Sequence, residues 1–79
     1  MKISDLEQEL EQIYGKTEGH RVYQTVVPGI MADFLKMVGQ ASIGRRVKEE
    51  YHLEDGRGTI ILETVKLSGT PDIRAEFRR

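Results

Sequence analysis

The chain contains no cysteine, and only two of its 79 residues are histidines, His20 and His52. The lack of cysteine excludes disulfide bonds and thiolate-bound zinc, and it is compatible with a reducing compartment. Two histidines give little support for an imidazole-based metal site. We therefore expect neither a structural metal nor another cofactor.

Long apolar runs are also missing. No segment approaches the roughly 18–20 consecutive apolar residues that a membrane-spanning helix needs. The first residues, MKISDLEQELEQ, are polar and acidic, whereas a secretory signal peptide has a basic start and an apolar middle. We expect a soluble, cytoplasmic protein that does not enter a membrane.

No clear excess of one charge is present. The chain has 12 basic and 13 acidic residues, for a net charge of −1. Domains dedicated to nucleic-acid binding usually carry a distinct basic excess. The overall charge therefore neither favours nor excludes a polyanionic partner.

The length of the chain predicts a single domain over residues 1–79. A domain of this size buries only roughly 60–65% of the surface that its unfolded chain exposes, so its core is thin. Thin cores are often supplemented by disulfides, a metal or a second subunit. Because the first is excluded and the second weakly supported, self-association is the expected source of additional stability.

The first part of the chain predicts a helix over residues 4–14. Ser4 and Glu7 have the spacing of a capping box, and apolar residues follow at helical intervals. Gly15 is placed to end this helix in a left-handed conformation.

The next segment, HRVYQTVV at residues 20–27, is rich in β-branched and aromatic side chains and predicts a strand. Pro28 and the glycine after it would end that strand. Helical periodicity returns over residues 30–41, which predicts a second helix with Pro28 near its start.

The remaining residues predict a three-stranded meander. Residues 45–54 and 59–67 flank Asp55-Gly56, a strong signal for a tight hairpin turn. The last strand falls within 72–79, where apolar and charged residues alternate. A turn at Asp55-Gly56 would form three favourable cross-strand pairs: Leu53 with Gly58, Tyr51 with Ile60, and Lys48 with Glu63.

These elements predict an α+β fold: helix-strand-helix followed by a three-stranded antiparallel meander, with two helices packed on one face of the sheet. Such a sheet leaves at least one open edge, where another chain can pair. The candidate edge strands are 20–27 and 72–79.

No motif indicates catalysis. Residues 39–46 have the two glycines of a phosphate-binding loop, but Arg45 and Arg46 occupy the positions that require lysine and then serine or threonine. No pattern links a serine to either histidine. We therefore expect that the protein is not an enzyme.

The sequence instead favours a small regulatory or adaptor domain that associates with protein, as a homodimer or as a subunit of a larger assembly. Exposed apolar residues and free cations are the candidate contacts. The candidate partner-binding residues are Val22, Tyr23, Met31, Leu35, Arg45, Arg46 and Arg57.

Two alternatives remain open. In the first, residues 31–53 form a winged-helix-like nucleic-acid-binding unit, with Arg45, Arg46 and Lys48 on a recognition helix and Arg57 at the wing tip. Acidic residues near these cations weigh against this alternative. In the second, a small ligand binds between the second helix and the sheet, near Tyr23, His52 and Arg45.

Overall fold

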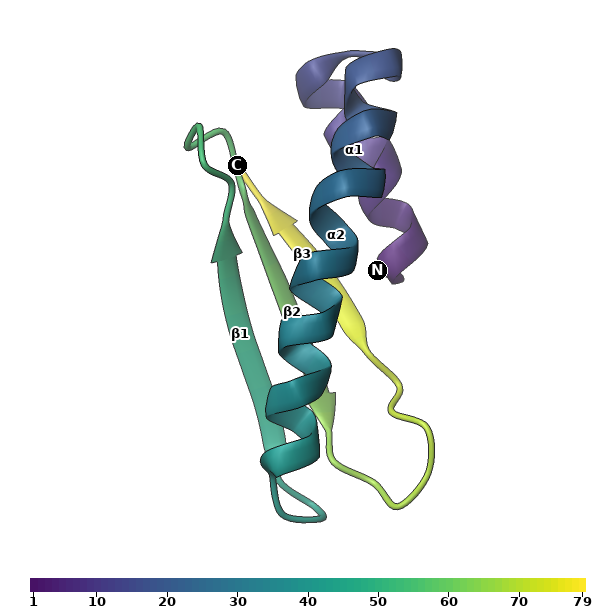
Figure 1. Cartoon of the computed structure of the whole chain (residues 1–79), viewed down its shortest axis with the longest axis vertical. Helices are drawn as coiled ribbons and strands as arrows, with labels where there is room; N and C mark the ends of the chain where they lie inside the picture. The colour runs from purple at the N-terminus through teal and green to yellow at the C-terminus, as the bar shows by residue number, and fades with distance from the viewer.

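The computed structural model describes residues 1–79 and contains two helices and a three-stranded antiparallel sheet (Figure 1). Both helices lie on the same face of the sheet, so the predicted α+β class and the one-sided packing are confirmed. The strand order is β1-β2-β3. The elements are a 3₁₀ turn (Ile3–Asp5), α1 (Leu6–Tyr14), α2 (Lys16–Gln40), β1 (Arg46–His52), β2 (Thr59–Val65) and β3 (Arg74–Arg78).

Helix α1 begins differently from its prediction but ends at the predicted glycine, which adopts another conformation than expected. The Ser4–Glu7 capping box does not form; instead, the Lys2 amide donates to the Asp5 carboxylate over 2.9 Å. Gly15 ends the helix as expected, with φ 90° and ψ 164°. This is not the left-handed helical conformation but a region that is essentially restricted to glycine, so one residue suffices to reverse the chain into α2.

The predicted strand at 20–27 is wrong, because these residues belong to α2. Gly19 lies directly against the backbone of α1, so the two helices pack closely and antiparallel. The residues that follow continue α2, and Val22 and Val27 among them are buried. Burying such side chains contributes about 1.5–3 kcal/mol each, which exceeds the few tenths of a kcal/mol that a β-branched residue costs in a helix.

Pro28 lies inside α2 rather than at the start of a helix. Proline has no N–H group to donate to the carbonyl four residues earlier, which belongs to Gln24. Both residues are exposed to solvent, so water can satisfy that carbonyl. The predicted helix–strand–helix order is therefore replaced by two helices in succession.

The predicted hairpin register is confirmed. Tyr51 pairs with Ile60 and Lys48 with Glu63, and the Leu53 amide donates to the Gly58 carbonyl over 2.9 Å. The turn itself lies one residue earlier than predicted, because the Gly56 amide donates to the Leu53 carbonyl and closes a turn centred on Glu54 and Asp55. Gly56 follows it with a φ of 74°.

The two edges of the sheet differ. At β3, the Ala75 amide donates to the Met1 carbonyl over 2.9 Å, and the Met1 nitrogen donates to the Ala75 carbonyl over 3.0 Å. Residues near 72–79 therefore form an edge strand as predicted, but Met1 occupies part of that edge. The other edge is β1, since the predicted edge strand at 20–27 is helical.

The core lies between the helices and the sheet, and Phe34 of α2 is its largest fully buried side chain. The opposite face of the sheet carries exposed ion pairs, including Arg46 with Glu63 at 3.7 Å. Neither helix combines the length and the apolar character required to cross a bilayer. The core cluster consists of Leu6, Leu10, Val22, Val27, Phe34, Val38, Val47, Leu53, Ile60, Leu62 and Ala75.

The close contact of the helices predicts that Gly19→Ala lowers the free energy of unfolding by about 1–3 kcal/mol. A Cβ at residue 19 would lie 2.7 Å from the carbonyl carbon of Leu10, and backbone cannot rotate away as a side chain can. Urea unfolding measures the effect. The matched control is Gly29→Ala in the same helix, where a Cβ meets nothing within 4 Å; we expect a gain of about 0.5–1 kcal/mol. Equal effects of the two substitutions would contradict this account.

Candidate protein-interaction edge

The outer edge of β1 carries backbone groups without partners. The Lys66 amide donates to the Arg45 carbonyl, and the Leu53 amide donates to the Gly58 carbonyl. On the β1 side, these bonds are made by the odd-numbered residues Arg45 and Leu53. In an antiparallel pair, the backbone groups of successive residues point alternately toward and away from the partner strand. The N–H and C=O groups of Arg46, Lys48, Glu50 and His52 therefore point away from β2, and no element lies beyond them (Figure 1).

The side chains of β1 divide between two environments. Val47 and Tyr51 face the helices, and Val47 is buried. The side chains of the four outward-bonding residues are exposed on the opposite face of the sheet. A strand added at this edge would therefore present one row of side chains toward α2 and the other toward solvent.

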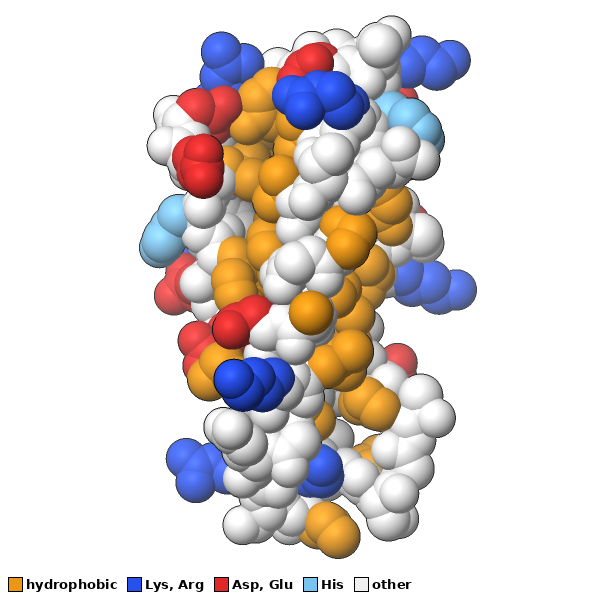
Figure 2. Space-filling model, in the orientation of Figure 1, with side chains coloured by type: hydrophobic (Ala, Val, Ile, Leu, Met, Phe, Trp, Pro, Cys, Tyr) orange, Lys and Arg blue, Asp and Glu red, His pale blue; other side chains and the backbone are white.

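Two separate hollows lie along β1 on the side of α2 and are together called the groove, its upper part beside the hairpin loop and its lower part near the end of α2. Its upper part has a volume of about 720 Å³, and Figure 2 shows apolar side chains gathered between the hairpin and the helix. Val26 on its helix wall is 36% exposed, so this apolar surface is only partly covered. The lining residues are Tyr14, Glu18, Arg21, Val22, Val26, Ile30, Glu50, Tyr51, His52, Leu53, Glu54 and Asp55.

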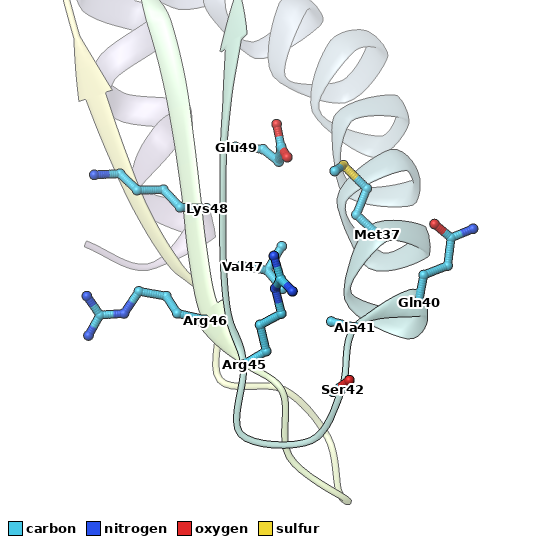
Figure 3. Close-up of a pocket in the computed structure, with 9 residues that line it drawn as sticks. All are labelled: Met37, Gln40, Ala41, Ser42, Arg45, Arg46, Val47, Lys48 and Glu49. Atoms are coloured by element: carbon cyan, nitrogen blue, oxygen red, sulfur yellow. The ribbon is translucent and has the colours of Figure 1, made fainter.

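The lower part of the groove lies where α2 ends and β1 begins. It has a volume of about 340 Å³. Met37 and Glu49 point toward one another across it, whereas Arg46 and Lys48 point away from α2 (Figure 3). The lining residues are Met37, Gln40, Ala41, Ser42, Arg45, Arg46, Val47, Lys48 and Glu49.

Charge changes sign along this edge. Arg45 directly precedes β1, and Arg46 and Lys48 lie in its first half; all three are exposed. Its end and the following loop carry Glu50, Glu54 and Asp55, which are also exposed. The edge is therefore electrically polar from one end to the other, even though the whole chain is nearly neutral.

Two tyrosines hold the groove in shape. The Tyr51 hydroxyl donates to the Asp33 carboxylate over 2.8 Å and connects β1 to α2. Burial, together with this hydrogen bond, raises the pKa of Tyr51 above its ordinary value of 10.0. The Tyr14 hydroxyl donates to Asp55 over 2.7 Å and connects α1 to the hairpin loop.

The hairpin loop carries a second set of contacts around Tyr14. The hydrogen bond from Tyr14 is the main cause that lowers the pKa of Asp55, while burial raises the pKa of Tyr14 itself. The Arg57 guanidinium lies 5.2 Å from the centre of the Tyr14 ring, within the range of a cation–π contact. Arg57 therefore has a local structural partner at the position where a wing tip was expected.

The structure brings only part of the predicted contact set together. Val22 lies in the upper groove, and Arg45 and Arg46 line the lower part. Tyr23 and Met31 pack against the core. Leu35 is 43% exposed but lies about 160° around α2 from Met37, away from the groove.

Sequence reasoning missed Val26, Ile30 and Met37 as groove residues. Ile30 and Met37 lie in the part of α2 that was predicted as helix, but the neighbouring strand that completes the groove was not placed beside them; Val26 was missed because its segment was assigned to a strand. The prediction of an extended 20–27 placed Val26 on a strand face instead.

The structure bears on both alternatives that the sequence left open, the winged-helix unit and the small-ligand site. Residues 46–52 are a strand, so the recognition helix of a winged-helix unit does not form. His52 lines the upper groove and Arg45 the lower one, while Tyr23 lines neither, so the suggested ligand-binding trio is not brought together. The two histidines have local partners: His20 contacts Glu7, and His52 contacts the Thr59 hydroxyl.

Comparison of the chain with models of protein families, with curated proteins and with solved structures finds no match.

The hydrogen bond between Tyr51 and Asp33 predicts a pH-dependent loss of stability. Because the folded-state pKa of Tyr51 lies above 10.0, the bond stabilises the fold fully below pH 10.0 and is lost as pH rises through the folded-state pKa. Tyr51→Phe should lower the free energy of unfolding by about 1 kcal/mol at neutral pH, with a difference from wild type that narrows above pH 10.0.

Urea unfolding across this pH range measures the difference. Tyr23→Phe, at a half-buried tyrosine that packs on the core, is the matched control, because it leaves the hydrogen bond between Tyr51 and Asp33 in place. A difference between Tyr51→Phe and wild type that stays constant with pH would contradict the assigned role of the hydrogen bond.

Proposed function

We propose that this protein is a small, non-catalytic, cytoplasmic regulatory or adaptor domain that binds an extended segment of protein along the outer edge of β1. In this mode of recognition the added segment becomes a further strand of the sheet. Backbone hydrogen bonds supply much of the affinity, and alternate side chains supply specificity.

The observation that carries the proposal is the open edge of β1 beside a groove. The outward N–H and C=O groups of Lys48 and Glu50 have no protein partner, in contrast to Ala75 of β3, which bonds to Met1. An added strand would satisfy these groups. Every second side chain of that strand would then enter the groove, where the apolar surface around Val26 and Tyr51 can contact it.

The charges around the groove favour protein over nucleic acid. Glu50, Glu54 and Asp55 lie along the upper part of the edge, where they would repel phosphate. Within β1 the exposed Arg46 and Lys48 lie toward the other end of the strand, and the nearby Arg21 and Arg57 are paired with Glu18 and Asp55. An extended peptide can match such a change of sign residue by residue, whereas a nucleic-acid backbone is uniformly negative.

Lys48→Pro tests the proposal because it removes one outward-pointing N–H group without removing a hydrogen bond between β1 and β2. Peptides selected from a random phage-displayed library should bind wild type and shift the amide NMR signals of β1. Lys48→Pro should weaken their binding about tenfold or more. Lys48→Ala, which removes the charge but keeps the N–H group, is the control and should bind within a few-fold of wild type.

Three results would contradict the proposal. Selected peptides that shift the signals of another surface would place the binding site elsewhere. Equal binding by Lys48→Pro and Lys48→Ala would exclude strand addition. Tight, steeply salt-dependent binding of random-sequence duplex DNA would replace the protein partner with nucleic acid.

A further inference from the structure

We infer that the segment bound at this edge is β1 of a second copy of the chain, aligned antiparallel across a twofold axis at Glu49. This inference rests on the proposed function and identifies its partner. Pairing would join two three-stranded sheets into one continuous sheet, with β1 of each copy at the centre and α2 of each copy on the same face.

The change in charge along β1 is the reason to choose a second copy. A twofold axis places the basic beginning of one strand beside the acidic end of the other. With the axis at Glu49, Lys48 of each copy lies opposite Glu50 of the other, in a pair that exchanges two backbone hydrogen bonds. Lys48 makes no ion pair within its own chain, and Glu50 has only an exposed contact with Arg78 at 3.4 Å.

This register is preferred over its two nearest alternatives. With the axis at Lys48, the two Lys48 side chains of the dimer would lie opposite each other on the solvent face. With the axis at Glu50, the two Glu50 carboxylates would lie opposite each other on that face. Only the axis at Glu49 overlaps the whole of β1, since Arg46 then lies opposite His52. It also forms two opposite-charge pairs, which stabilise a sheet.

On the face of the sheet toward α2, this register brings together one favourable pair of side chains and one repulsive pair. Val47 of each copy lies opposite Tyr51 of the other, a favourable pairing of a β-branched with an aromatic side chain. Met37 is 36% exposed beside the same strand, so α2 offers apolar surface to the approaching copy. The cost is that Glu49 faces its own copy with Cα atoms about 4.5 Å apart.

Charge exchange tests the pairing directly. Sedimentation equilibrium of wild type, at concentrations up to about 1 mM, should show a monomer–dimer equilibrium. Lys48→Glu and Glu50→Lys should each weaken self-association about tenfold, because each converts both opposite-charge pairs into like-charge pairs. An equimolar mixture of the two variants should form a heterodimer with an affinity within a few-fold of wild type, because both pairs become opposite again.

Two further variants complete the experiment. Glu49→Gln should strengthen the dimer, because it removes the repulsion on the axis. Lys2→Glu, a charge reversal next to the Met1–Ala75 pairing at the opposite edge of the sheet, should leave the affinity unchanged. If a charge-reversal variant fails to fold, as circular dichroism would show, the effect of Glu49→Gln on the dimer affinity tests the pairing instead.

A wild type that stays monomeric at all these concentrations would overturn the inference. So would a dimer whose affinity is unchanged by the charge reversals, or one whose affinity is lowered by Glu49→Gln. These outcomes are separable from failure of the proposed function. If wild type is monomeric yet Lys48→Pro abolishes peptide binding, the edge binds another protein. If Lys48→Pro changes neither peptide binding nor self-association, the edge itself is not the binding site.

Discussion

The close contact between α1 and α2 at Gly19 is the constraint on which the rest of the structure depends. The absence of a side chain at this position lets the backbone of α2 lie against that of α1 near Leu10 and Glu11. The chain must therefore reverse within one residue, at Gly15, and continue as helix through residues that would otherwise suit a strand. A single long α2 results, and it covers the sheet only up to the groove beside β1.

The consequences for the sheet follow from this arrangement of the helices. If residues 20–27 formed a strand, they could pair with the meander and cover one of its edges. Because they are helical, the sheet has three strands, and β1 remains at its border. The contact that stabilises the helical layer thus also accounts for the open edge. Tyr51 and Asp33 then fix the distance between this border and α2 through their hydrogen bond.

Local signals in the sequence were sufficient for the hairpin but not for α2. The pairing of Tyr51 with Ile60 follows from alternation and a nearby turn, both of which involve neighbouring residues. The fate of residues 20–27 depends on a contact with α1 instead, and tertiary contacts override the modest preference of valine and threonine for strands. The same error made 20–27 one of the two candidate edge strands in place of β1, whereas the other candidate, 72–79, contains the edge strand β3.

The pairing of Met1 with Ala75 has a consequence for the order of assembly during translation. These two residues are separated by 74 positions, so their hydrogen bonds cannot form until the ribosome has produced β3. The helical hairpin and the β1–β2 hairpin consist of residues that emerge earlier. Until β3 has been made, the edge of β2 that later pairs with β3 is also open. The nascent sheet therefore has two open edges, whereas in the completed sheet only the edge at β1 is open along its whole length.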